Sequence, residues 1–332
     1  MSKVIEQKMW AVGGGKGGIG KSVLTVSLSL WLAKLGKQVI IVDADLGGAN
    51  LNILLGIRYP NVTLEDFIKK EVGTLEETLI DTPHKNLKLI CGAGDMLGLA
   101  NPKYTQKMRL LRHLSKLDAD FILLDLGAGT SYNVLDFFLY AKGKIAVFSP
   151  QATSLQNVYG FIKSSLLRYL HRNFNNDISL SPLLARFTLG IGREKINSVT
   201  ELKKVFRQVG EEEYLRLCKA LDCFDINIVI NMVKKDTDLE ISKVLQMVSE
   251  KYLDIHITDF GSVEYDAEIE ESINRMVPFL MDNSQSKAAM STYQIAYGMI
   301  RGNGPSPPVT GHVCSDIPTT PLRAANGSPI NL

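Results

Sequence analysis

The sequence predicts an α/β protein with a doubly wound, mostly parallel sheet and helices on both of its faces. Two observations support this fold class. Short apolar runs without polar alternation recur along the chain, at 9–12, 38–42, 87–91, 121–124, 144–148 and 227–230. Such runs are typical of parallel strands that are buried on both faces. Stretches with helical spacing separate them, and polar or glycine-rich residues follow several of them, where ligands bind in such sheets.

A glycine-rich segment follows the first predicted strand. Residues 13–22 read GGGKGGIGKS and fit the pattern G-x-x-x-x-G-K-[ST] from Gly15 to Ser22. This pattern predicts a phosphate-binding loop, because its glycines let backbone N–H groups approach phosphate oxygens and the next helix directs its positive end at them. That helix is predicted over 22–35, with Gly36 ending it. A chance glycine-rich turn is the weaker interpretation.

Three side chains of this loop are candidates for chemistry. Lys21 would place a positive charge near the β- and γ-phosphates, and Ser22 would supply a hydroxyl ligand for Mg²⁺. Lys16 is a second lysine, which an ordinary phosphate-binding loop does not need. It is either a specialised residue or a solvated lysine that varies freely.

Carboxylates follow two of the predicted strands. The strand at 38–42 leads into Asp43 and Asp45, and the strand at 121–124 leads into Asp125. The carboxyl ends of central parallel strands face the ligand crevice, and an aspartate after a buried strand has the form of a Walker B magnesium site. Turn formation or helix capping is the alternative for each aspartate. The nearby phosphate-binding loop favours the functional interpretation.

Together, several blocks of sequence resemble the MinD/ParA class of P-loop ATPases, which has a deviant Walker A motif. The blocks are residues 15–22, 43–50, 125–129 and the strand that ends in Asn231, and the resemblance covers residues 8–301. Within this class the FlhG/FleN branch, which controls flagellar number and placement, is nearest. The segments that carry this finer resemblance are 124–131, 150–154 and 159–163.

The resemblance implies ATP or ADP and Mg²⁺ as ligands. Ser22 would ligate Mg²⁺ with Asp125 in support, and Asp43 would lie just beyond these ligands. Asn231 would read the adenine edge, for which an amide has both a donor and an acceptor. The implied nucleotide contacts are Gly15, Gly17, Gly18, Ile19, Gly20, Lys21, Ser22, Val23, Gly127 and Asn231.

Three further residues would act in catalysis or switching. By resemblance, Asp45 orients or activates the attacking water beside Lys21. Lys16 reaches the nucleotide of a second subunit, much as an arginine finger does. Asn50 is a candidate switch residue. The implied activity is slow ATP hydrolysis by a molecular switch that forms a homodimer on binding ATP.

The resemblance also implies a cellular role. The switch would position or regulate a structure, such as the flagellum or the division site, through an unidentified protein partner. The alternative is a ParA-like partition ATPase that binds DNA without sequence specificity. Its support is a basic stretch at 160–221, which holds eleven Lys or Arg residues and six Asp or Glu residues. A solvated helix face is the favoured explanation of that stretch.

The amino-acid composition argues against several other classes of site and location. The net charge of +2 gives no general attraction to nucleic acid or anionic membranes. The four cysteines show no CxxC spacing, which argues against a zinc site, a disulfide framework and an iron–sulfur scaffold. With no apolar leader and no long apolar run, a cytoplasmic protein is expected.

The predicted organisation is a single ATPase domain over 1–301 with a family-variable insertion at 173–224. Within it we expect one long helix at 199–221 and a last short strand at 255–259, followed by a helix that begins at 265. The proline-rich tail at 302–332 is expected to be disordered. It shows no amphipathic pattern, so membrane binding is not expected.

Overall fold

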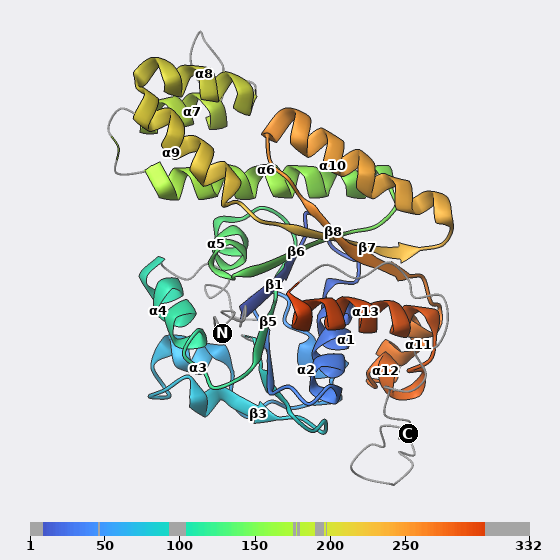
Figure 1. Ribbon diagram of the computed structural model, residues 1–332. Helices are drawn as coiled ribbons and strands as arrows, with labels where there is room; N and C mark the ends of the chain where they lie inside the picture. The colour runs from blue at the N-terminus through green and yellow to red at the C-terminus, as the bar shows by residue number, and fades with distance from the viewer. Residues whose placement is uncertain are drawn as a thin grey trace, which may run out of the picture.

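An eight-stranded sheet forms the centre of the molecule (Figure 1). The computed structural model describes residues 9–45, 47–92, 104–174, 177, 180–189, 196 and 198–302. The strand order is β3-β4-β2-β5-β1-β6-β7-β8, and all neighbours are parallel except β3 and β4. The strands are β1 Met9–Gly13, β2 Val39–Asp43, β3 Leu79–Asp81, β4 Leu87–Ile90, β5 Phe121–Asp125, β6 Gly143–Phe148, β7 Asn227–Val233 and β8 Thr258–Glu264. The predicted fold class is confirmed.

Helices cover both faces of the sheet. Their bounds are α1 Lys21–Lys34, α2 Leu51–Leu54, α3 Leu64–Lys69, α4 Tyr104–Leu114, α5 Tyr132–Tyr140, α6 Ala152–Phe174, α7 Ser181–Leu189, α8 Val199–Val209, α9 Glu211–Asp222, α10 Glu240–Leu253, α11 Glu268–Asn274, α12 Phe279–Asp282 and α13 Lys287–Arg301. Short 3₁₀ helices lie at Glu76–Thr78 and Asp236–Leu239. Helices α7, α8 and α9 gather beside α6 at one end of the molecule (Figure 1).

Side chains of the strands alternate between two cores. In β1, Ala11 packs into the core that α3, α4, α5 and α6 cover, whereas Trp10 and Val12 face the core under α1 and α13. Trp31 fixes α13 onto α1, because its buried indole N–H donates to the carbonyl oxygen of Ala289 at 3.0 Å. Burial of an aromatic ring together with a satisfied N–H stabilises this helix pair.

The strand order places a topological switch point at β1. From β1 the chain runs outward to β2 on one side, with β5 later inserted between them, and after β5 it crosses to β6 on the other side of β1. Ligands of open α/β sheets bind outside the carboxyl ends of the strands at such a point. The segment Gly14–Gly20 lies there, between β1 and α1.

Several predicted elements need correction. The single helix expected at 199–221 is two helices, because Gly210, with extended backbone, separates α8 from α9. The last strand is Thr258–Glu264 rather than 255–259, since buried residues lie on both sides of Gly261, at Phe260 and Val263. The helix expected from 265 begins at Glu268. The sequence reading also missed β3, α5 and α7.

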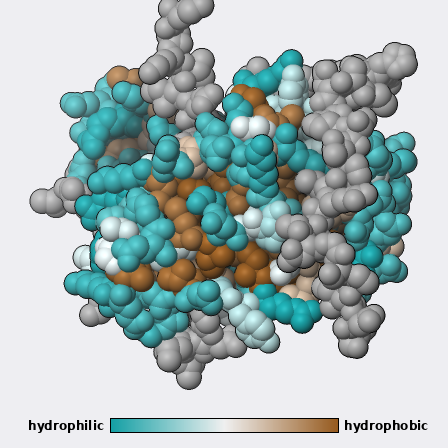
Figure 2. Space-filling model, turned by 90° about the horizontal axis from the view of Figure 1, so that it is seen from below, coloured by the Kyte–Doolittle hydropathy of each residue, from teal (hydrophilic) through white to brown (hydrophobic). Residues whose placement is uncertain are grey.

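Three further predictions concern the end of α1, the tail and membrane-spanning helices. Helix α1 ends as predicted, with Gly36 at a φ of +83°. The predicted tail beyond Gly302 lies outside the described residues. No helix in the described part of the chain is long and apolar enough to cross a membrane. Seen from below, hydrophobic residues gather at the centre of the surface within a hydrophilic surround (Figure 2).

Candidate functional site

The predicted phosphate-binding loop packs tightly against its surroundings. A β-carbon on Gly15 would lie 2.1 Å from the carbonyl oxygen of Asn157 in α6, so only glycine fits there. Gly17 and Gly18 instead line a cavity, and a β-carbon on Gly18 would meet nothing within 4 Å. The loop therefore has one packed side and one open side, as a backbone cradle for an anion requires.

Lys21 is a buried cation at the start of α1. Its side chain is 8% exposed, and Nζ donates to the carbonyl oxygen of Lys16 at 3.3 Å. Burial lowers the pKa of Lys21, while the nearby charges of Asp125 and Asp45 raise it. An ammonium group that is largely removed from water, at the positive end of a helix, suits a polyanionic ligand.

Asp125 lies behind the start of α1. It is 1% exposed, and its Oδ1 accepts a hydrogen bond from Thr25 Oγ1 at 3.1 Å. The Ser22 hydroxyl also donates to this carboxylate. Burial, together with the charge of Asp43, raises the pKa of Asp125 to about 7, although these hydrogen bonds and the charge of Lys21 oppose the rise.

Ser22 and Asp125 are thus adjacent, as the Mg²⁺ prediction requires. No group of three or more His, Cys, Asp or Glu residues lies close enough to hold a metal ion among the residues that the structure describes. Mg²⁺ commonly takes only one or two protein ligands and completes its octahedron with water and phosphate oxygens. The residues present therefore fit a magnesium ion that binds together with a nucleotide.

Asp43 fastens the segment that follows β2. Its carboxylate is fully buried and accepts backbone N–H bonds from Asp45 at 3.2 Å, Asn50 at 2.8 Å and Leu51 at 3.0 Å. Burial raises the pKa of Asp43 to about 6, and these three bonds oppose the rise. Asp43 therefore fastens the segment that leads into α2 and caps the start of this helix, which is the alternative role that the sequence offered for this aspartate.

Asp45 lies at the edge of the cavity, half-buried beside the segment after β5. Its carboxylate lies beside Gly127, where an added β-carbon would be 2.9 Å from Oδ1 of Asp45. Because the charges of Asp45 and Asp125 both act on Lys21, the ends of β1, β2 and β5 bring the predicted carboxylates and lysine to one place. Asn50 lines the same cavity.

Lys16 and Asn231 flank this centre. Nζ of Lys16 donates to Oε1 of Gln151 at 3.1 Å and to Oγ1 of Thr153 at 3.3 Å, at the start of α6. Its role across a dimer interface stays a prediction. Asn231 lines the cavity, and its amide contacts the phosphate-binding loop. Its role in reading adenine also stays a prediction.

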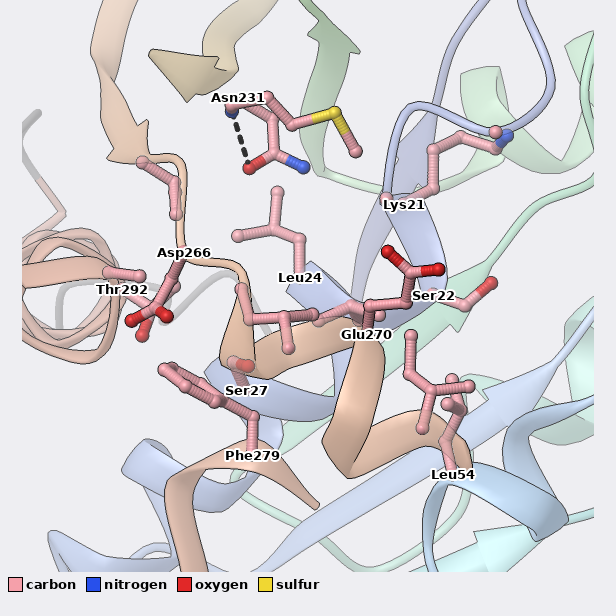
Figure 3. Close-up of a pocket in the computed structure, with 18 of the residues that line it drawn as sticks. Lys21, Ser22, Leu24, Ser27, Leu54, Asn231, Asp266, Glu270, Phe279 and Thr292 are labelled. Atoms are coloured by element: carbon pink, nitrogen blue, oxygen red, sulfur yellow. Dashed lines mark hydrogen bonds between the residues drawn. The ribbon is translucent and has the colours of Figure 1, made fainter. Parts of the chain in front are cut away.

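The cavity has a volume of about 670 Å³ and extends beyond the loop. Figure 3 shows Lys21 and Ser22 on one side, Asp266 and Thr292 on the other, and Leu24 between them. Part of its lining is apolar and includes Leu24, Leu54, Ile269 and Phe279. The sequence reading missed the contributions of β8, α11, α12 and α13, because no recognisable motif marks residues that line a cavity only through tertiary packing.

Comparison with known sequences also indicates a phosphate-binding loop of the P-loop NTPase kind. Residues 5–165 match a family model described as "ParA: NUBPL iron-transfer P-loop NTPase". The chain is 34% identical to the antiactivator FleN of Pseudomonas aeruginosa over 155 residues, 46% of this chain and 54% of FleN. It is 32% identical to the septum site-determining protein MinD of Helicobacter pylori over 144 residues, 43% of this chain and 53% of that protein. The chain thus spans about half the length of these curated relatives.

Solved structures share the fold over most of the chain. MinD of Pyrococcus horikoshii, complexed with Mg-ADP, matches with a TM-score of 0.59 and 21% identity, over 87% of this chain and 94% of that chain. The cell division ATPase MinD of Pyrococcus furiosus matches with a TM-score of 0.61 and 21% identity, over 89% and 99%. The MinC:MinD complex of Aquifex aeolicus gives a TM-score of 0.58 and 17% identity, over 92% and 99%.

Proposed function

We propose that this chain, whose residues 5–165 match a ParA P-loop NTPase family model, is an ATP-hydrolysing switch that works as a homodimer. One observation carries the proposal. The buried ammonium of Lys21 lies under the influence of both Asp125 and Asp45, beside a cavity lined by the glycines of the loop. A cation, a candidate metal-supporting carboxylate and a candidate water-orienting carboxylate are the parts that phosphoryl transfer needs.

Each residue of the site has a proposed task. Backbone N–H groups from Gly17 to Gly20 and the ammonium of Lys21 bind phosphate oxygens. The Ser22 hydroxyl ligates Mg²⁺, with Asp125 holding Ser22 in place. Bound Mg²⁺ would neutralise charge on the phosphate oxygens. Asp45 orients the attacking water, since it is the carboxylate at the cavity edge rather than behind the helix.

The proposed switch consists of the segments after β2 and β5. Asp43 holds the first segment through three backbone bonds. The second is tied to the phosphate-binding loop by a hydrogen bond of 3.1 Å from the Gly129 N–H to the carbonyl oxygen of Gly14. Since both segments adjoin the expected γ-phosphate position, gain or loss of that phosphate can change their shape.

Lys16 is the proposed link between subunits. Within the described chain, its partly exposed ammonium donates to the neutral side chains of Gln151 and Thr153. Exchange of these contacts for phosphate oxygens of a partner subunit would be favourable, because charge-assisted hydrogen bonds are stronger than neutral ones. This supports a homodimer that ATP stabilises.

A comparison of variants tests this function. We would measure ATP turnover, and mass by light scattering with ATP and Mg²⁺, for Lys16→Ala, Lys21→Ala and Asp45→Ala. Lys21→Ala should lose ATP binding, Asp45→Ala should form dimers without turnover, and Lys16→Ala should lose both dimers and turnover. Lys116→Ala, which removes an exposed lysine elsewhere, is the control. Normal dimers and turnover in Lys16→Ala would contradict the role across the interface.

The similarity to FleN and MinD supports a role in regulating the number or position of a cellular structure. Whether that structure is the flagellum or the division site depends on a protein partner. The Asp45→Ala variant in ATP should accumulate the partner-binding state, so it is the suitable bait. Retention of flagellar or division proteins by this variant, and not by Lys21→Ala, would decide between the two roles.

DNA binding of the ParA type is the second candidate. The basic stretch at 160–221 supports it, but several of its cations have carboxylate partners within the fold. Arg168 pairs with Asp136, Lys203 with Asp254 and Arg216 with Asp177. An electrophoretic shift with ATP at two salt concentrations tests this role, since many phosphate contacts make affinity fall steeply with salt. The absence of a shift at low salt would reject it.

A further inference from the structure

Asn231 is directed at the phosphate-binding loop by an irregularity in β7. The pairing of β7 with β8 shifts register between Ile230 and Val233. Within this irregularity Met232 adopts a φ of +63°, which non-glycine residues rarely do. A left-handed residue at a shifted register changes the local strand direction. The side chain that precedes it, Asn231, is buried against α1 and the loop.

The amide of Asn231 makes two short hydrogen bonds. Nδ2 donates to the carbonyl oxygen of Ile19 at 2.8 Å, and Oδ1 accepts from the Met232 N–H at 3.0 Å, a bond that Figure 3 marks. The side chain is 8% exposed. A β-carbon on Gly20 would lie 2.4 Å from Nδ2, so the amide rests directly against the last glycine of the loop.

The bond to Ile19 has a consequence for the next N–H group. In a planar trans peptide, the C=O of one residue and the N–H of the next point in opposite directions. Because Asn231 holds the C=O of Ile19, the N–H of Gly20 is turned away from β7. Backbone N–H groups of this part of the loop are the donors that hold phosphates. Asn231 therefore fixes the orientation of a phosphate donor without touching the phosphate.

We infer that Asn231 is a positioning residue of the phosphate-binding loop, whether or not it also contacts adenine. This inference rests on the proposed nucleotide-binding function. An amide has two N–H donors and an oxygen with two lone pairs. The two bonds described here use one donor and one lone pair, which leaves one of each for a base. Phosphate positioning and adenine reading are therefore separable.

The test uses ligands with and without a base. We would measure, by calorimetry with Mg²⁺, the affinity of wild type and Asn231→Ala for ATP, GTP and inorganic tripolyphosphate. A positioning role predicts a similar loss for all three, about three- to tenfold, as expected for one hydrogen bond. A loss confined to ATP would overturn the inference, because it would show that Asn231 acts only on the base.

Asn227→Ala is the matched control. Asn227 lies on the same strand, and its Nδ2 donates to the carbonyl oxygen of Lys144 at 3.1 Å, a bond of the same kind away from the loop. Its removal should leave all three affinities unchanged. An equal loss of tripolyphosphate binding in both variants would mean that weakening β7 alone accounts for the effect, which would also overturn the inference.

Asn231→Asp keeps the shape of the side chain and replaces the donor with an oxygen that faces the Ile19 carbonyl oxygen. We expect a larger loss of tripolyphosphate affinity than in Asn231→Ala, whereas an unchanged affinity would contradict the inference. Failure of the proposed function looks different. Wild type would then bind none of the three ligands, whereas failure of the inference alone leaves wild-type binding intact.

Discussion

The carboxylate of Asp45 rests on the backbone of Gly127. A β-carbon on Gly127 would lie only 2.9 Å from Oδ1 of Asp45, closer than real β-carbons approach other atoms. Asp45 follows β2 and Gly127 follows β5, so the two proposed switch segments are in direct contact. We therefore expect a change of shape in one segment to affect the other through packing.

Gly127→Ala should displace Asp45 and reduce ATP turnover. An added methyl group, at 2.9 Å from Oδ1, would force the Asp45 carboxylate to move, and a displacement of about 1 Å from the reactive geometry can cost roughly 100-fold in rate. We expect the turnover number to fall at least tenfold and the affinity for ATP to change less. Gly160→Ala is the control, since a β-carbon there would meet nothing within 4 Å. Equal turnover in the two variants would show that turnover does not depend on the contact between Gly127 and Asp45.

Thr25→Val should weaken the support of the proposed magnesium site. The Thr25 hydroxyl lies 3.1 Å from Oδ1 of Asp125 and 2.9 Å from the carbonyl oxygen of Lys21. Valine keeps the volume and leaves the buried carboxylate without this donor, at a cost of about 1–3 kcal/mol. We expect more Mg²⁺ to be needed for half-maximal turnover.

Ser29→Ala is the comparison for this variant. Ser29 donates to the carbonyl oxygen of Thr25 at 2.8 Å, one turn further along α1, and its own hydroxyl does not bond to Asp125. The unfolding free energy of Ser29→Ala should be lower than that of wild type, whereas the Mg²⁺ dependence of its turnover should not change. If both variants require the same Mg²⁺ concentration as wild type, Asp125 does not depend on Thr25.

Asp136→Asn should destabilise the fold strongly. Asp136 is 1% exposed on α5 and binds Lys107 of α4 and Arg168 of α6. Removing one partner of a buried ion pair typically costs about 3–5 kcal/mol. Asp282→Asn removes an exposed carboxylate that pairs with Arg275, and should cost less than about 1 kcal/mol. Denaturant unfolding measures both, and similar costs would contradict the prediction.

The same network predicts a pH dependence. Burial raises the pKa of Asp136, but hydrogen bonds and charges from Arg168 and Lys107 outweigh this and hold it below the ordinary value. A carboxyl group whose pKa is lower in the folded state stabilises the fold above its unfolded pKa of about 3.9, and this stability is lost as the pH falls through the folded value. Asp136→Asn should lack this acid-dependent component, which unfolding curves between pH 2 and pH 5 would show.

The sequence predicted those parts of the site that short motifs specify. A phosphate-binding loop needs glycines and a lysine at fixed spacing, and a buried strand that ends in aspartate needs only neighbouring residues, so Lys21, Ser22 and Asp125 could be located. The buried strands were equally visible, because their apolar runs are local. Lys16 could also be singled out, because it lies within the motif. Its contacts with Gln151 and Thr153 could not be predicted, because those residues are distant in the sequence.

Features that depend on tertiary contacts could not be predicted. The bond from Asn231 to the Ile19 carbonyl joins residues 212 positions apart. The cavity wall at Phe279 and Thr292 arises from helices that pack on α1. The break at Gly210 and the full extent of β8 depend on how neighbouring elements pack, which helix propensity and a single glycine do not indicate. Local pattern thus gives the chemistry of the site, and packing gives its geometry.

Asp43→Asn should loosen the segment 45–51 and impair turnover even though Asp43 is not assigned to touch nucleotide or Mg²⁺. The fully buried carboxylate accepts three backbone N–H bonds, and the amide would direct its own N–H groups at one or two of these donors. Each lost bond to a charged acceptor costs about 1.5–3 kcal/mol. Hydrogen exchange should therefore quicken at Asn50 and Leu51. Asp120→Asn is the control, because Asp120 accepts the Gln38 N–H at 2.7 Å away from the site. Unchanged exchange in Asp43→Asn would show that the segment holds its shape without this carboxylate.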